Sequence, residues 1–227
     1  MAAKLDLVQS TVMHPFKVAV LVSGSGSNLQ ALIDARDTGT LGAEIVLVLS
    51  DRADAYGLQR ALHHAIPCAF VPLPRAPAEA RAAVRAAWER QLLGILSVFQ
   101  PELVVLSGFM RVLSAAFLDR CPAQVINQHP ALLPAHGGDH VVTSGGLVIP
   151  ALRGAHVVAE ALRRGLPITG CTVHRVTPAV DDGPVLASAE VPILPGDDEA
   201  TLHERIKAEE RRLIVEVVAR LAHESRT

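Results

Sequence analysis

The sequence FKVAVLVSGSGSN, residues 16–28, joins a run of strand-forming residues to a glycine-rich turn and the start of a helix. The apolar, β-branched composition predicts a strand over Lys17 to Ser23 that is buried on both faces. Gly24 and Gly26 then allow a tight turn, and Asn28-Leu29 opens a segment of helical period. A strand, a glycine turn and a helix in this order are typical of the first unit of a parallel α/β sheet.

The same alternation continues along the rest of the chain. Further short apolar runs predict strands, and longer segments of helical period separate them. A helix is predicted over Ala78 to Gln100, where Pro101 ends it, and a last amphipathic helix over Glu199 to Ala222. The predicted fold is an α/β single domain, an open, mostly parallel twisted sheet with a Rossmann-like N-terminal half. Its further strands are Glu44 to Ser50, Ala69 to Pro72, Leu103 to Ser107, Gln124 to Gln128, Ile168 to Val176 and Leu186 to Pro192.

Composition narrows the class of protein. The chain has 227 residues, 50% hydrophobic and 19% charged, with a net charge of -2, which suits one large domain. Balanced charge argues against a nucleic-acid partner, and no apolar run is long enough to predict a membrane span. Three cysteines without paired spacing indicate a reducing, cytoplasmic location. Residues 1–15 are predicted to be a loose extension, in which Met13 is an alternative start.

The glycine loop predicts an anion site. Backbone N–H groups at a helix N-terminus favour a phosphate, so the run from Ser23 to Leu29 is a candidate phosphate-binding loop. Leu29 replaces the third glycine of the dinucleotide fingerprint, and no P-loop ending follows. Two alternatives stay open: a turn with no ligand, and NAD binding, for which Asp51 after the second strand would hold the ribose.

Polar side chains at another strand end predict acyl-transfer chemistry. Asn127 and His129 follow the apolar Val125-Ile126 pair two residues apart, so both point to one side at the carboxyl end of the strand. Each can donate a hydrogen bond to a developing oxyanion. A structural histidine is the competing interpretation.

The turn-forming run Thr177 to Pro184 supplies a carboxylate that can complete this pair. Asp181 lies in it, after a strand-like segment, where it can meet the imidazole of His129. An aspartate that only caps the turn is the alternative. Spacing along the sequence leaves both open.

Four ordered motifs carry a resemblance to a known family. They are SGSGSNLQA at 23–31, GFMRVL at 108–113, NQHPALLP at 127–134 and DDGP at 181–184. Together they resemble the phosphoribosylglycinamide formyltransferases from about Phe16 to Ala222. The resemblance implies the formyltransferase fold and transfer of a formyl group from 10-formyltetrahydrofolate to the amine of N1-(5-phospho-D-ribosyl)glycinamide in purine (IMP) biosynthesis. It implies small-molecule substrates, no metal, and either a monomer or a homodimer.

The resemblance also assigns residues. Asn127, His129 and Asp181 fall on the catalytic positions, and His156 on a supporting one. The mechanism expected for these residues is direct attack of the amine on the formyl carbon, with Asn127 and protonated His129 stabilising the tetrahedral oxyanion and Asp181 raising the proton affinity of His129. The ribonucleotide site comprises Gly26, Ser27, Asn28, Lys207 and Glu210, and the folate site comprises Arg85, Met110, Arg111, Val112, Leu113, Asn127, Pro178, Ala179, Val180 and Asp181.

One segment departs from the family pattern. A Gly-x-His motif occurs at Gly138-Asp139-His140 and again at Gly154-Ala155-His156, and only the second leads into a helical segment. This predicts a domain at 16–227 with an insertion at about 138–153, expected to be an irregular, mobile loop beside the site. His136, Asp139 and His140 in this region make only a weak metal motif.

Four other functions compete with the transferase. A formyltetrahydrofolate deformylase would carry an N-terminal regulatory domain, and a methionyl-tRNA formyltransferase a C-terminal domain and a basic surface. A non-catalytic folate or nucleotide-binding module follows if the insertion blocks one substrate. A dinucleotide-dependent redox enzyme leaves the Asn127, His129 and Asp181 set without a role.

Overall fold

The computed structural model describes residues 14–135 and 137–226. Three features named above lie outside these ranges: Met13 as an alternative start, His136, and nearly all of the predicted extension at 1–15. Among the described residues, no helix is both long and apolar enough to cross a membrane.

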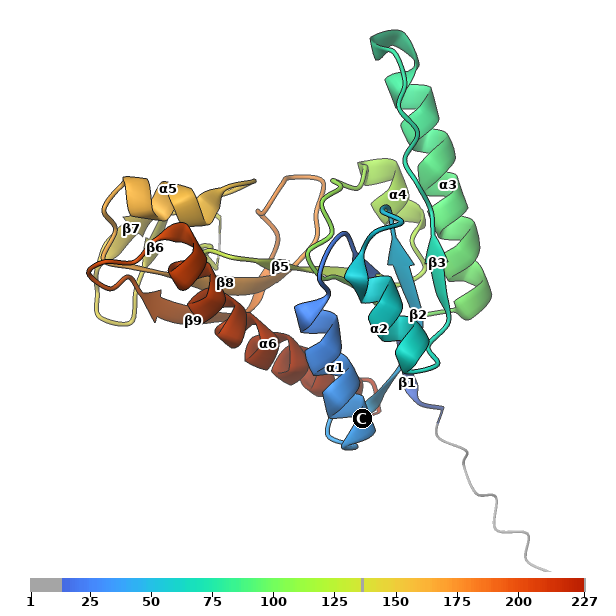
Figure 1. The fold of residues 1–227 in the computed structure, drawn as a ribbon, viewed down its shortest axis with the longest axis horizontal. Helices are drawn as coiled ribbons and strands as arrows, with labels where there is room; N and C mark the ends of the chain where they lie inside the picture. Colours follow the sequence, from blue (N-terminus) through green and yellow to red (C-terminus); the bar gives the residue numbers. More distant parts are fainter. Residues whose placement is uncertain (1–13, 136, 227) are drawn as a thin grey trace, which may run out of the picture.

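A seven-stranded sheet in the order β3-β2-β1-β4-β5-β8-β9 runs through the molecule (Figure 1). Neighbouring strands from β3 to β5 are parallel, and β8 and β9 are added antiparallel. The predicted α/β, mostly parallel sheet is therefore confirmed. The strands are β1 (Phe16–Val22), β2 (Ala43–Ser50), β3 (Cys68–Phe70), β4 (Leu103–Leu106), β5 (Gln124–His129), β8 (Ile168–Arg175) and β9 (Val185–Pro192).

Helices cover both faces of the sheet, as the apolar strands require. In β1, Val18 and Val20 pack in one hydrophobic cluster with α1 (Ser27–Asp37), α2 (Tyr56–His63) and α6 (Glu199–Glu224). Ala19 and Leu21 point to the other face and pack with α3 (Arg81–Phe99) and α4 (Ala115–Arg120). Burial of both strand faces explains why the run at 16–22 shows no polar alternation.

Local signals set the ends of the two long helices. A 3₁₀ turn at Ala78–Ala80 precedes α3, and Gln100 ends the helix in a left-handed conformation, φ 49°, just before Pro101. Trp88 of α3 is buried, donates its indole N–H to the Val71 carbonyl and stacks on Phe109 with ring centroids 6.3 Å apart. A capping box between Asp198 and Thr201 begins α6.

The segment predicted as an insertion carries regular structure. β6 (His140–Val142) and β7 (Val148–Pro150) pair as an antiparallel hairpin, and α5 (Val157–Arg163) follows. The expectation of an irregular loop here is wrong, because β-branched residues on both sides of a glycine turn pair with each other. The Ser144 hydroxyl in the turn donates a 2.8 Å hydrogen bond to Glu190 of β9, which ties the hairpin to the main sheet.

Candidate active site

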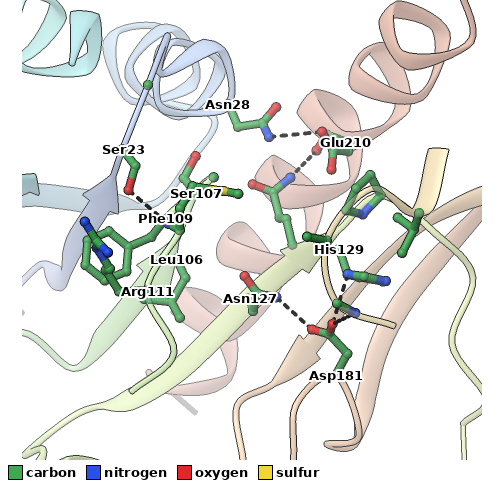
Figure 2. Close-up of a pocket in the computed structure, with 18 of the residues that line it drawn as sticks. Ser23, Asn28, Leu106, Ser107, Phe109, Arg111, Asn127, His129, Asp181 and Glu210 are labelled. Carbon is green, nitrogen blue, oxygen red and sulfur yellow. Dashed lines mark hydrogen bonds and ion pairs between the residues drawn. The ribbon is translucent and has the colours of Figure 1, made fainter. Parts of the chain in front are cut away.

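A cleft of about 630 Å³ lies at the carboxyl ends of β1, β4 and β5. This is where ligands bind in open parallel sheets. Loops after these strands, the start of α5 and one face of α6 form its walls, and Figure 2 shows Asn28, Asn127, His129, Asp181 and Glu210 converging on it. Apart from Arg85 and Pro178, every predicted site residue lines the cleft: Gly26, Ser27, Asn28, Met110, Arg111, Val112, Leu113, Asn127, His129, His156, Ala179, Val180, Asp181, Lys207 and Glu210.

The glycine loop presents the N-terminus of α1 to the cleft. Gly26 has φ 67°, in the left-handed region, and a Cβ there would lie 2.8 Å from the Cα of Gly57 in α2. Its carbonyl accepts from the Gln30 N–H. The amides of Ser27 and Asn28 precede that first helical hydrogen bond, and by helix geometry they have no acceptor within the helix. This loop can therefore hold an anion.

A buried polar contact joins α1 to α6 at the same wall. The Asn28 amide nitrogen donates to the Glu210 carboxylate at 3.4 Å, and Asn28 Oδ1 is buried without a partner among the described residues. Burial raises the pKa of Glu210. Its neighbour Glu209 points away and pairs with Arg212 at 2.8 Å, so Glu210 is the one that faces the cleft. An unpaired amide oxygen beside a carboxylate is suited to ligand hydroxyl groups.

The Asn127, His129 and Asp181 side chains meet in space. Asn127 Nδ2 lies 3.5 Å from Asp181 Oδ1, and His129 Nδ1 lies 3.4 Å from Asp181 Oδ2. The two-residue spacing in β5 brings both side chains to one side, as expected from strand geometry. Asp181 has φ 50°, an unusual left-handed conformation for a residue other than glycine, and it turns its carboxylate toward both side chains.

His129 is enclosed by protein acceptors. Its Nε2 lies 2.7 Å from the Leu152 carbonyl, so this nitrogen carries the proton. Burial lowers the pKa of His129 below its ordinary value and outweighs Asp181 and the Leu152 hydrogen bond, which raise it. Asp181 thus acts in the predicted direction, but the net shift is opposite to that expected for a histidine kept protonated. Nor is the Nε2 donor free for a substrate while it donates to Leu152.

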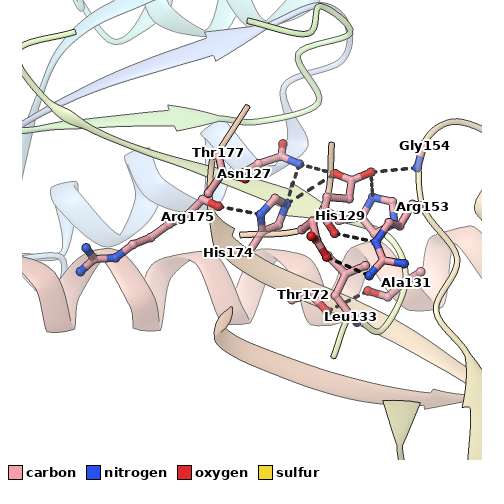
Figure 3. Close-up of polar contacts among 12 residues, drawn as sticks. Asn127, His129, Ala131, Leu133, Arg153, Gly154, Thr172, His174, Arg175 and Thr177 are labelled. Carbon is pink, nitrogen blue, oxygen red and sulfur yellow. Dashed lines mark hydrogen bonds and ion pairs between the residues drawn. The ribbon is translucent and has the colours of Figure 1, made fainter. Parts of the chain in front are cut away.

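His174 is a site residue that the sequence interpretation did not select. It lies in β8 directly opposite Asn127 of β5. Its Nε2 is 3.2 Å from Asn127 Nδ2 and 3.5 Å from Asp181 Oδ1, and its Nδ1 faces the Arg175 carbonyl at 2.9 Å (Figure 3). The antiparallel pairing of β5 with β8 creates this contact. Only the strand order, which no motif encodes, reveals it.

The 108–113 loop forms a more exposed wall. Met110 is 72% exposed, and Arg111 pairs with the buried Asp51 at 2.6 Å. Asp51 also accepts from the Ser23 hydroxyl. Because Asp51 already has these partners, it is not presented to a nucleotide ribose, and the NAD interpretation loses its acidic residue.

Two predicted folate residues lie outside the cleft lining. Arg85 of α3 donates to the Val112 carbonyl at 2.9 Å, so it braces the loop from outside. Pro178 is absent from the lining, whereas its neighbours Thr177 and Ala179 contribute to it.

One face of α6 closes the cleft. Glu199, His203, Lys207 and Glu210 follow each other at helical spacing and all line it. Lys207 Nζ is paired with Glu204 at 2.7 Å. Glu199 and His203 were not predicted as site residues, although steps of four, four and three residues from Glu199 through His203 and Lys207 to Glu210 place all of them on one helix face, which is a usable signal.

Comparison with known proteins agrees with this geometry. The formyl transferase family model matches residues 16–218. Phosphoribosylglycinamide formyltransferase of Mycobacterium tuberculosis is 41% identical over 92% of this chain and 86% of its own length, and the Escherichia coli protein of that name is 35% identical over 89% and 85%. Glycinamide ribonucleotide transformylase 1 from Symbiobacterium toebii superimposes with a TM-score of 0.79 at 35% identity, covering 93% of this chain and 90% of that structure. The resemblance inferred from the motifs is confirmed, and the chain belongs to the formyl transferase family.

Proposed function

We propose that the protein transfers the formyl group of 10-formyltetrahydrofolate to the amine of glycinamide ribonucleotide, a step of purine biosynthesis. The observation that carries this proposal is the meeting of Asn127, His129 and Asp181 beside the helix N-terminus at Gly26. One end of the cleft is built for an anion and the other for proton transfer, which suits a phosphorylated amine substrate.

In the proposed reaction the substrate amine attacks the formyl carbon and forms a tetrahedral oxyanion. The oxyanion collapses, the bond from carbon to N10 of the folate breaks, and the proton lost by the amine passes to N10. Asn127 donates to the oxyanion, and Asp181 orients His129 and assists the proton movement, directly or through water. His129 becomes a donor to the substrate once its Nε2 leaves the Leu152 carbonyl.

The proposed ribonucleotide site uses the α1 and α6 walls. The amides of Ser27 and Asn28 hold the phosphate, while Lys207, Glu210 and the unpaired Oδ1 of Asn28 contact the sugar and glycinamide groups. The folate occupies the wall formed by 110–113 and the 179–181 loop, with Asn127 between the two ligands. A cytoplasmic location is part of the proposal, since Cys68, Cys121 and Cys171 are free thiols.

An absorbance assay of folate deformylation, run with and without glycinamide ribonucleotide, tests the proposal. The expected result is turnover that depends on the ribonucleotide and yields the formylated product. Turnover without it would indicate a deformylase, and folate binding without turnover would indicate a binding module; either result would overturn the transferase.

A further inference from the structure

We propose that Arg153, which lies between the β6–β7 hairpin and the cleft, is a positioning residue that holds Asp181 in its working conformation. The proposal rests on the transferase function above. It gives the hairpin a role in the reaction, although no hairpin residue lines the cleft.

Arg153 joins the hairpin to the Asp181 turn. Its Nε donates to the Asp181 carbonyl at 3.1 Å, and its Nη2 donates to the Gly138 carbonyl at 2.6 Å and to the Asp182 carboxylate at 3.0 Å. Nη1 lies 3.7 Å from Asp139. The planar fork of a guanidinium can serve these acceptors together, whereas an ammonium group cannot.

The residues on either side of Arg153 act on the same pair of catalytic side chains. The Leu152 carbonyl accepts from His129 Nε2. The Gly154 N–H donates to Asp181 Oδ2 at 2.8 Å, and Figure 3 shows Gly154 beside His129 and Arg153. Consecutive residues 152–154 therefore contact the imidazole, the backbone of Asp181 and its carboxylate. A displacement of this segment would move both members of the pair.

Asp181 needs such a restraint because its backbone is left-handed. A residue other than glycine keeps a positive φ only where its surroundings enforce it. The turn that contains it is exposed on one side, and Ala179 and Val180 before it are also exposed. The hydrogen bond from Arg153 to the Asp181 carbonyl fixes the peptide group that follows the left-handed residue.

The hairpin gives Arg153 a fixed base. The Ala151 N–H donates to the Asp139 carbonyl at 2.8 Å, so the two ends of the hairpin are joined two residues before Arg153. At the far end, the Ser144–Glu190 contact docks the hairpin on β9. The Ser144–Glu190 contact can be weakened without changing Arg153, which allows an effect of hairpin docking to be distinguished from an effect of Arg153 on Asp181.

The test compares Arg153→Ala and Arg153→Lys with two controls in the full chain. Arg163→Ala removes an equally charged, 71% exposed side chain of α5 that lies outside the cleft lining, and Glu190→Gln weakens hairpin docking without touching Arg153. The measurements are kcat and KM for both substrates, kcat with added guanidinium ion, the melting temperature, and side-chain ¹⁵N spectra of the histidines.

Arg153→Ala is expected to lower kcat by about 100-fold, the effect of a misplacement of about 1 Å at a reacting group. KM for the ribonucleotide should change by less than about threefold, because its proposed binding groups on α1 and α6 are untouched, whereas KM for the folate should rise because the 179–181 loop moves. The kcat of Arg153→Lys should lie between those of Arg153→Ala and wild type. Added guanidinium ion should restore kcat only in Arg153→Ala. His129 signals should shift in Arg153→Ala and stay unchanged in Arg163→Ala.

The proposal is overturned if Arg153→Ala keeps its kcat and its His129 signals. It is also overturned if kcat falls equally in Arg153→Ala and Glu190→Gln, follows the melting temperature and is not restored by guanidinium, because the role is then structural. Failure of the transferase proposal shows separately, as a lack of ribonucleotide-dependent turnover in wild type, and the histidine spectra then judge the positioning of the pair without turnover.

Discussion

Asn127 is held by long contacts. Its Nδ2 lies 3.2 Å from His174 and 3.5 Å from Asp181, both longer than the usual 2.9 to 3.0 Å of such hydrogen bonds. The free-energy cost is therefore small when this donor turns to a substrate oxygen. We expect its main contribution to appear in the transition state and not in the stability of the fold.

Asn127→Ala should lower kcat by about 10²- to 10³-fold, the typical effect of losing one oxyanion donor. The melting temperature should change little, because the long hydrogen bonds of Asn127 stabilise the fold only weakly. Steady-state absorbance kinetics with a thermal melt check both statements. An Asn127→Ala enzyme with nearly normal kcat would remove Asn127 from the catalytic group.

The protonation of His129 should determine how activity depends on pH. The groups that face its ring are Asp181, His174, Arg153 and the Leu152 carbonyl. Asp181 raises the pKa of His129 against the larger effect of burial, so Asp181→Asn should lower that pKa further. If protonated His129 supports transfer, activity is lost as pH rises through this pKa, and in Asp181→Asn the loss occurs at lower pH.

Histidine side-chain NMR titration gives the pKa of His129 directly, and a kcat–pH profile gives its consequence. Asp54→Asn is the control, because it removes a carboxylate that pairs with the exposed Arg52 and lies outside the cleft lining. An unchanged His129 titration in Asp181→Asn would contradict the assigned pairing.

The turn between β1 and α1 imposes two constraints on Gly26. The left-handed φ disfavours any side chain, and a Cβ would collide with Gly57 of α2. Gly26→Ala should destabilise the fold by about 1–3 kcal/mol for the conformation, with a further cost for the collision. It should also raise KM for the ribonucleotide, because the α1 amides move. Urea unfolding and substrate kinetics measure the two effects.

Gly24→Ala is the control in the same loop, since a Cβ there meets nothing within 4 Å and its φ is not positive. Its unfolding free energy should stay within about 0.5 kcal/mol of wild type. Equal destabilisation by both substitutions would show that the loop tolerates no change at all and that the collision with Gly57 is not the cause.

The sequence predicts best those helices and strands whose formation depends on residues close together in the chain. β1, the glycine turn and α6 depend on nearby residues, and their predicted positions agree with the structure to within about two residues, the usual uncertainty of element ends. The β6–β7 hairpin escapes prediction because its strands are three residues long and rich in exposed positions. Such short strands give too few alternations to distinguish them from a loop.

Prediction of the site residues is limited in the same way, because it too depends on residues that are close in the sequence. Asn127 and His129 share a strand end, so their common side was predictable, whereas the contacts of His174 and Leu152 depend on strand order and hairpin docking. Asp51 is a residue for which local sequence gave the wrong expectation. Its position after β2 suggested that it binds a nucleotide, and only the fold shows that its carboxylate pairs with Arg111.

Glu210 joins three elements of the fold, because it connects α6 to both α1 and β5. Asn28 donates to its carboxylate, and the Gln128 side chain donates to its carbonyl at 2.9 Å. Burial raises the pKa of Glu210 above its unfolded value. The stability this group contributes is therefore present at pH below the unfolded pKa and is lost as pH rises through the folded pKa.

Glu210→Gln should increase the free energy of unfolding at pH 8 relative to wild type and change it less at pH 4, because the neutral amide carries no penalty for buried charge. The same substitution should weaken ribonucleotide binding. Urea unfolding at both pH values tests the first statement. Glu209→Gln is the control, because the Glu209 side chain is 37% exposed and pairs with Arg212 outside the cleft, so its replacement removes no buried charge.

The stacked pair of Trp88 and Phe109 gives the protein an internal optical probe. The chain has a single tryptophan, and its indole is 1% exposed and rests on the residue immediately before Met110 at the cleft wall. Its fluorescence should therefore be blue-shifted in the folded protein and should change when a ligand displaces the 110–113 loop. Binding of a folate can then be titrated by emission in the unlabelled chain, with Phe109→Leu as the variant in which the signal weakens.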